Sequence, residues 1–357
     1  MSYFEALDDS DLVLDALPDA VTASLDVRNA SLQSLSVSGH RGLEFIVSDL
    51  RSWRPRSALR VAFLDGDQDL HGDIAHVAGQ IGTVCGMTLD FGELADGSFR
   101  RWSEADTDHA ADIRVSFDKR GNFSLVGTDS IDGSVGDAFG TVGGRPGQTS
   151  LNLGGFAVKR PAGWRGTVLH EFLHALGFHH AHQNMRGPCQ AAFRWEDDEG
   201  YQPCRDGVGR YISDRDGRRP GIYTYLAGYP NHWDRAKVDR NLKTEEDPAV
   251  IAGPFDPASV MLYRFPPLFY RTTPSACAPV GDGQTLSEGD IRGLQLLYPP
   301  HDGGAGAEAY LASQKALLGA LDAAEAHVAD NLETPGGAAG LPVLRSAAQV
   351  LRRKLDG

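Results

Sequence analysis

The chain has 357 residues, of which 41% are hydrophobic and 23% charged, an ordinary composition for one large globular domain with extensions or for two domains. Its 48 acidic side chains outnumber the 34 basic ones, and no block of Lys and Arg occurs, which argues against nucleic-acid binding and against attachment to an anionic membrane surface. No run of 18 apolar residues exists, so we expect no membrane-spanning helix.

The first 55 residues form a predicted N-terminal extension, accessory or pro-like in character. An acidic helix is expected over residues 3–25, broken at Pro18, and a short strand over residues 43–50. The chain's start lacks a basic segment followed by an apolar one, as a secretory signal would have. We therefore expect a cytoplasmic location, with export by a non-classical route as the alternative.

Residues 56–300 form the predicted catalytic domain, beginning with the order β-α-β-β-β. The helix is marked by Ile74, Val77, Ile81 and Val84, which fall on one face. This order predicts an α/β (α+β) fold with a twisted, mixed and mostly parallel sheet backed by a helix. The expected strands cover residues 59–64, 87–91, 112–117, 123–126 and 150–153.

A second helix is predicted around residues 166–176, and Gly177 stands where a left-handed glycine would end it. Residues 184–220 are polar and rich in Gly, Asp and Arg, which indicates a long surface excursion. A third helix is predicted over residues 286–298, with Ser287 and Asp290 at its start as a capping pair.

Residues 301–357 are rich in Ala and Leu and form a predicted C-terminal helical hairpin. One apolar stripe runs through the first half, the segment from Thr334 to Gly337 interrupts it, and residues 344–355 resume it. The stripe consists of Leu311, Leu318, Leu321 and Val328.

The four cysteines are too few for a disulfide scaffold. Cys189 and Cys204 flank a polar loop and could pair in an oxidising compartment, whereas Cys85 follows an apolar helical pattern and is expected to be a buried thiol. No cysteine spacing suggests a metal site.

The chemistry is carried by the segment HEFLHALGFHH at residues 170–180. His170 and His174 lie four apart, so on a helix they project from one face, and the turn allowed by Gly177 brings His180 back as a third ligand. A hydrolytic zinc site has three protein ligands and an open position for water. Glu171, beside the first ligand, can then take a proton from the water and return it to the leaving amine. His179 and His182 are rival third ligands that the spacing disfavours.

The motif and its surroundings resemble the metzincins, and within them bacterial astacin-like and matrixin-like peptidases. The resemblance covers about residues 59–299 and includes RVAFLDGD, DIRVSFD, SLVGTDS, TSLNLGG and LSEGDIRGLQLLYP. It implies one catalytic Zn²⁺ and a methionine turn beneath it, which DPASVMLY at residues 256–263 resembles. Met261 would be the apolar floor, and Tyr263 would stabilise the oxyanion or, alternatively, only pack beside the turn.

The resemblance also implies an edge strand that binds an extended substrate through its backbone. The alternative is that this segment is an ordinary edge strand with no role in binding. The candidate is Ser150, Leu151, Asn152 and Leu153. Arg264 and Arg271, after the methionine turn, suggest tolerance for acidic or polar residues on the substrate's primed side.

The chain departs from the family in three respects. Ala181 replaces the glutamate that follows the third histidine in astacin-like chains. Residues 1–55 carry no matrixin-type cysteine motif and no convincing inhibitory aspartate.

The predicted function is therefore a zinc endopeptidase that acts on a peptide or protein substrate. One alternative is a zinc-stabilised binding module that does not turn over, although Glu171 and an open three-histidine site argue against it. Another is an enzyme kept latent by residues 1–55. The oligomeric state is not predicted.

Overall fold

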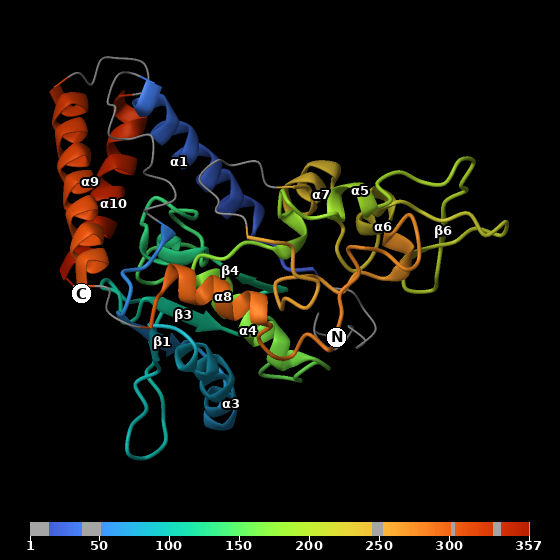
Figure 1. The fold of residues 1–357 in the computed structure, drawn as a ribbon, viewed down its shortest axis with the longest axis horizontal. Coiled ribbons are helices and arrows are strands. Elements are labelled where there is room, and N and C mark those ends of the chain that lie inside the picture. The colour runs from blue at the N-terminus through green and yellow to red at the C-terminus, as the bar shows by residue number, and fades with distance from the viewer. Residues whose placement is uncertain (1–13, 38–50, 245–252, 301–303, 331–336, 357) are drawn as a thin grey trace. The chain divides into compact units, whose positions relative to one another are not determined.

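The computed structural model describes residues 14–37, 51–244, 253–300, 304–330 and 337–356 (Figure 1). The strand predicted at residues 43–50 lies outside these ranges. The chain divides into two compact units, each built from separate stretches of sequence. The first unit comprises residues 1–16, 160–167 and 179–290, and the second comprises residues 17–159, 168–178 and 291–357.

The second unit contains a five-stranded mixed sheet in the order β2-β1-β3-β5-β4. Strands β1, β3 and β4 of this sheet are labelled in Figure 1. The first four strands in this order run parallel, and β4 joins β5 antiparallel. The prediction of a mixed, mostly parallel sheet in an α+β arrangement is confirmed. The strands are β1 (Ala58–Phe63), β2 (Thr88–Asp90), β3 (Ile113–Ser116), β4 (Asn122–Ser124) and β5 (Leu151–Leu153).

Helix α3 (Gln68–Gly79) follows β1 as predicted. It begins at Asp67, whose carboxylate accepts a hydrogen bond from Leu70 N at 2.8 Å, and it buries Ile74 and Val77. The prediction that this helix continues to Val84 is wrong, because residues 80–83 form the 3₁₀ turn η2 (Gln80–Thr83) and not a further turn of α-helix. Beyond β4, a second 3₁₀ turn, η3 (Gly127–Ile131), is buried throughout.

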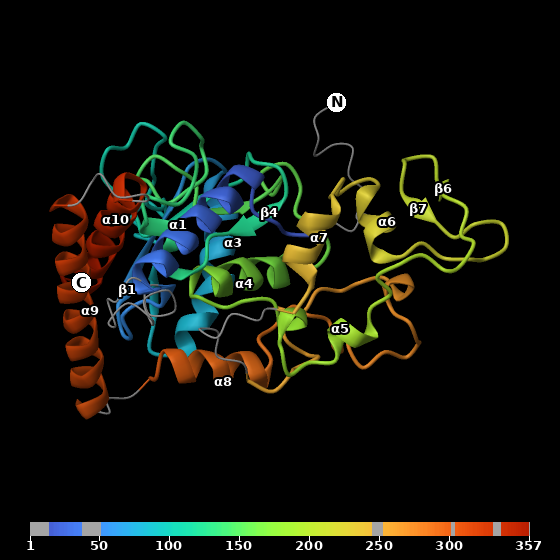
Figure 2. The same ribbon diagram turned by 90° about the horizontal axis from the view of Figure 1, so that it is seen from above.

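The C-terminal region consists of the long helices α9 (Gly304–Asp330) and α10 (Gly337–Asp356), side by side as predicted (Figures 1 and 2). Two exposed ion pairs, Arg345 with Glu325 and Arg352 with Asp322, show that they run antiparallel. Helix α1 (Asp19–Val37) begins directly after Pro18 and packs against α10.

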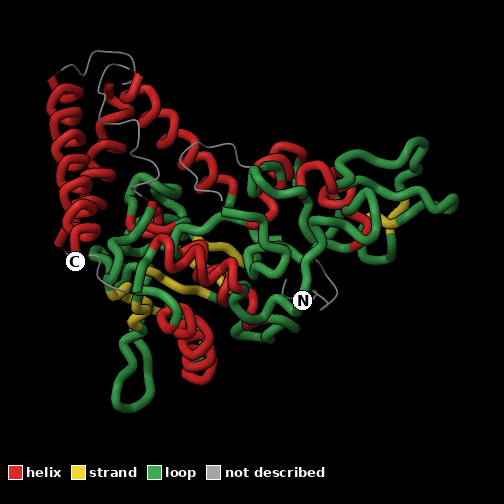
Figure 3. Tube along the Cα trace, viewed as in Figure 1, coloured by secondary structure: helices red, strands yellow, loops and turns green. Residues whose placement is uncertain are grey.

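The first unit consists mostly of loops with short elements (Figure 3). Its core gathers aromatic residues that include Phe193, Trp233 and Phe269. Helix α8 (Glu288–Leu297) starts here, with the predicted reciprocal cap: Ser287 N and Asp290 N each donate to the other's side chain at 2.9 Å. The short elements are η4 (Ala181–Gln183), α5 (Cys189–Ala192), β6 (Cys204–Arg205), β7 (Tyr211–Ile212), α6 (Ile222–Ala227), α7 (Arg235–Leu242) and η5 (Pro267–Phe269).

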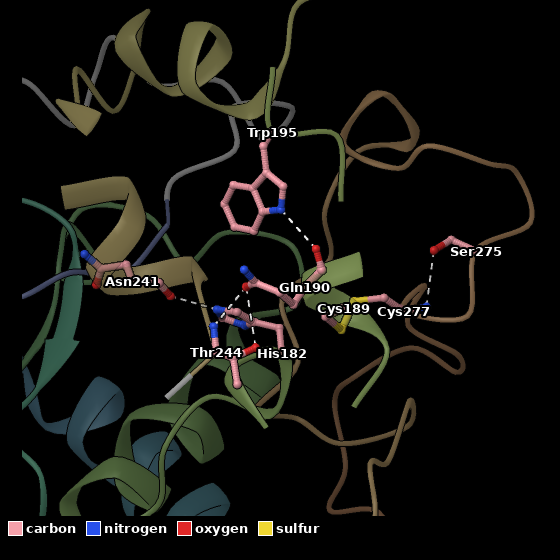
Figure 4. The surroundings of a disulfide bond; sticks show 8 residues. All are labelled: His182, Cys189, Gln190, Trp195, Asn241, Thr244, Ser275 and Cys277. Atoms are coloured by element: carbon pink, nitrogen blue, oxygen red, sulfur yellow. Dashed lines mark hydrogen bonds between the residues drawn. A yellow bond between two sulfur atoms is a disulfide. The ribbon is translucent and has the colours of Figure 1, made fainter. Parts of the chain in front are cut away.

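The disulfide of this unit joins Cys189 to Cys277, not to Cys204 as the loop suggested (Figure 4). Cys204 is a free, half-buried thiol, and Cys85 is a buried thiol as expected. Among the described residues, no helix is both long and apolar enough to cross a membrane.

Candidate metal centre

Helix α4 (Trp164–Ala175) carries the first half of the motif. Its apolar side chains from residue 168 onward, including Phe172 and Leu173, are buried. Three polar side chains are buried with them: His170 is 7% exposed, Glu171 1% and His174 5%. Burying such groups costs free energy unless they have partners, so their position on a core helix points to a role beyond packing.

The C-terminal end of α4 is firmly held within the second unit. Gly177 has a φ of 99°, the left-handed conformation that its position predicted. The last carbonyls of a helix have no intrahelical partner. Here the Trp53 indole donates to Ala175 O at 2.7 Å, and the Tyr298 hydroxyl donates to Leu176 O at 2.6 Å.

The two helical histidines are arranged as ligands would be. Their rings are 4.8 Å apart and nearly perpendicular. His174 Nδ1 lies 2.7 Å from Phe178 O, so Nδ1 carries a proton, and in the neutral ring Nε2 then keeps a lone pair. The carbonyl that orients His174 is thus supplied by the turn that Gly177 allows.

In the first unit, His180 contacts two side chains through its two ring nitrogens. Its Nε2 lies 3.0 and 3.1 Å from the two carboxylate oxygens of Asp15, which is 8% exposed. Its Nδ1 lies 3.1 Å from Gln183 Oε1. A carboxylate therefore occupies the side of His180 from which a metal would be bound.

Asp15, His170, His174 and His180 each offer a ligand atom, and these atoms lie within 4.8 Å of one another. This mostly buried Asp/His group could hold a metal ion. Among the described residues, neither of the two rival histidines belongs to this group. His182 is instead engaged elsewhere, with its Nε2 2.8 Å from Asn241 O.

The predicted methionine turn is hydrogen-bonded to the residue that follows His180. Ala181 N donates to Met261 O at 2.9 Å, and Met261 itself is buried. Ser259 Oγ accepts from Met261 N at 3.0 Å and donates to Asp290 at 2.6 Å, which ties the turn to the start of α8.

Tyr263 packs its ring 4.6 Å from that of His180. Its hydroxyl donates to Asp15 O at 3.0 Å, so the backbone of the N-terminal segment holds the phenol. Asp15 thus contacts His180 through its side chain and Tyr263 through its backbone.

The predicted edge strand is wrong. Ser150, Leu151, Asn152 and Leu153 are buried, and β5 pairs with β3 on one side and β4 on the other. Asn152 is engaged internally, where it accepts from Ser116 Oγ at 2.8 Å. The antiparallel edge of the described sheet is β4, because the chain reaches that edge first and then returns inside it.

Both arginines predicted near the substrate are exposed, with their guanidinium groups bonded to backbone carbonyls. Arg264 Nε donates to Asp282 O at 3.2 Å, and Arg271 Nε donates to Phe193 O at 3.0 Å.

Asp15 is the site residue that sequence reasoning missed. It stands among apolar residues in LVLDALP with no motif around it, and its partner His180 is 165 positions away. The one available signal was an acidic residue just before Pro18, in a segment otherwise apolar enough to be buried.

No protein-family model matches the chain, and no curated protein matches it. Among solved structures, a structure of myroilysin is similar with a TM-score of 0.49 and 23% identity, covering 71% of this chain and 97% of that one. A crystal structure of myroilysin is similar with a TM-score of 0.39 and 21% identity, covering 70% of this chain and 86% of that one. Likeness this weak supports no statement about family, activity or metal.

Proposed function

We propose that the protein is a zinc-dependent endopeptidase of the metzincin type. The proposal rests chiefly on the group of Asp15, His170, His174 and His180, with the buried Glu171 adjacent to the first histidine. Imidazole nitrogens together with a carboxylate are a donor set that suits zinc. The backbone bond to His174 Nδ1 also leaves the Nε2 of that ring available for an ion.

Glu171 would act as the general base and then the general acid. When bound, the ion would polarise the scissile carbonyl and lower the pKa of the attacking water. Glu171 takes the proton from that water and passes it to the leaving amine. Because the Glu171 carboxylate is buried, it does not readily exchange protons with bulk water during this transfer.

Tyr263 and β4 complete the proposed substrate site. The Tyr263 phenol, beside His180, would donate a hydrogen bond to the oxyanion once Asp15 O no longer accepts from it. An extended peptide would add to the edge strand β4 in place of the buried β5. Met261 would form the apolar floor, and Arg264 and Arg271 would favour acidic or polar residues after the cut.

The experiment is cleavage of a peptide library, with new termini read by mass spectrometry. Wild type is compared with Glu171→Ala and with chelator-treated wild type. We expect cuts that disappear in both, because one lacks the base and the other the ion. Full activity in Glu171→Ala would exclude the mechanism.

A specific observation favours a latent form over an open one. A catalytic zinc site keeps one position for water, whereas four protein ligands make a closed site. Asp15 supplies the fourth donor and also holds Tyr263. We propose that the segment at residues 14–16 holds the enzyme at a low basal activity until it leaves, which is the latent alternative of the sequence analysis with its residue identified.

Asp15→Ala tests this latency. Removing the carboxylate should raise peptide cleavage by at least tenfold in the full chain, with Asp19→Ala, outside the group, as the matched control. Cleavage that stays at the wild-type level, with zinc still bound, would exclude latency. No cleavage by either protein would point instead to the non-catalytic, zinc-stabilised binding module.

A further inference from the structure

The third histidine has its own supporting side chain in the first unit, and that side chain is Gln183. To bind an ion through Nε2, His180 must carry its proton on Nδ1. Gln183 Oε1, 3.1 Å from Nδ1, is the acceptor for that proton. Gln183 is 7% exposed, so bulk water does not compete readily for the bond.

The amide of Gln183 is oriented by helix α7. Its Nε2 lies 2.9 Å from Arg240 O and 3.2 Å from Lys243 O, at the end of that helix. Two carbonyls can accept only from the NH₂ end of an amide, so the oxygen end must face His180. The orientation of Gln183 is therefore decided independently of the bond to His180.

The neighbouring side chain, His182, bonds the turn η4 to the same end of α7. His182, in η4 with Gln183, has its Nε2 2.8 Å from Asn241 O (Figure 4). Helix α7 is itself anchored in the core of the first unit by Val238 and Leu242, which are fully buried. Together these bonds give the turn after His180 a rigid support.

We infer that Gln183 is a positioning residue that fixes the tautomer and orientation of His180 for metal binding. The inference rests on the proposed zinc site and adds a residue to it. Groups that accept from the second nitrogen of a ligating histidine typically change metal affinity by ~10- to 100-fold. For His174 the acceptor is a backbone carbonyl, whereas for His180 it is a side chain that a substitution can remove.

The test separates the oxygen of Gln183 from its NH₂ group. Gln183→Leu loses both, while Gln183→Glu keeps an oxygen for His180 Nδ1 but loses the donors to α7. Asn184→Ala is the matched control, because it removes an exposed amide one residue away that donates to Gly253 O at 3.0 Å. For each full-length variant, zinc affinity is measured by competition with a chromophoric chelator, and the Co²⁺-substituted site by its visible absorption spectrum.

We expect Gln183→Leu to bind zinc ~10- to 100-fold more weakly and to change the Co²⁺ spectrum. Gln183→Glu should stay within about threefold of wild type, and Asn184→Ala should be unchanged. The inference is overturned if Gln183→Leu matches wild type, or if Gln183→Glu loses as much affinity as Gln183→Leu, since the α7 anchor alone would then matter. A wild type that binds no zinc would overturn the proposed function as well, so the two failures are distinct.

Discussion

Arg114, which is fully buried, and His109, which is half-buried, show how single side chains organise the loops around the sheet. Arg114 is fully buried and donates to backbone carbonyls, including Gln148 O at 2.6 Å and Gly143 O at 3.1 Å. Burial lowers the pKa of Arg114 to about 9. Burial, followed by the charge of Arg114, lowers the pKa of nearby His109 to about 4, although its Nε2 lies 2.9 Å from Gly144 O.

The depressed pKa of His109 predicts a loss of stability in acid. Between about pH 6.5 and the folded-state value of about 4, the unfolded chain binds a proton at this residue and the folded chain does not. Stability therefore falls as pH drops through this window, by ~1–2 kcal/mol after allowing for partial exposure of the side chain. His109→Gln keeps a donor to Gly144 O and should remove this part of the dependence.

Urea unfolding at pH 7 and pH 4.5 checks the prediction. The difference in unfolding free energy between the two pH values should be smaller in His109→Gln than in wild type. Equal differences would show that His109 titrates normally.

At the scale of elements, α1 is held in place within the second unit by a buried ion pair. Arg28 Nη1 lies 2.5 Å from Asp129 and 3.2 Å from Asp132, and all three side chains are less than a tenth exposed. Ser346 of α10 donates to Asp132 at 2.5 Å. Apolar contacts of Val21 with Phe123 of β4 add to this attachment. The element that follows the proposed inhibitory segment is thus a packed part of the fold.

Arg28→Leu should be strongly destabilising. It leaves buried Asp132 without its cation and Asp129 with only Arg51 Nε at 3.9 Å, and breaking a buried pair typically costs ~3–5 kcal/mol. Arg352→Leu is the matched control, because its pair with Asp322 is about half exposed and such pairs contribute ~0–1 kcal/mol. Unfolding in denaturant measures the free energy of unfolding of both variants. Equal decreases would mean that the buried ion pair stabilises the fold no more than the exposed one.

At the scale of the whole molecule, the disulfide closes a loop of 88 residues in the first unit. Because disulfides persist in oxidising compartments, we propose that the protein is exported, which is the alternative to the cytoplasmic location expected from the sequence. The bond joins α5 to the loop between η5 and α8, and both cysteines belong to the aromatic core.

Replacing both cysteines by serine should lower the free energy of unfolding by ~2–4 kcal/mol, because the unfolded chain gains freedom. Cys204→Ser, which removes the half-buried free thiol, should change it little. The prediction fails if the double variant and Cys204→Ser are equally stable.

Local patterns in the sequence predicted local structure well. The period of Ile74 and Val77, the position of Gly177, and the pair Ser287 and Asp290 each led to the correct helix or cap, because the interactions involved span one turn. What the sequence could not specify depends on distant pairing. Strand order decides that β5 is interior, and chain folding decides that Cys189 meets Cys277 and that Asp15 meets His180.

The most direct test of the central claim measures bound zinc and peptide cleavage together in wild type, Asp15→Ala and Asp15→Ala/Glu171→Ala. The account predicts one zinc per chain in all three, cleavage that rises in Asp15→Ala, and loss of that cleavage when Glu171 is also removed. Cleavage that persists in the double variant, or a wild type without zinc, would contradict it.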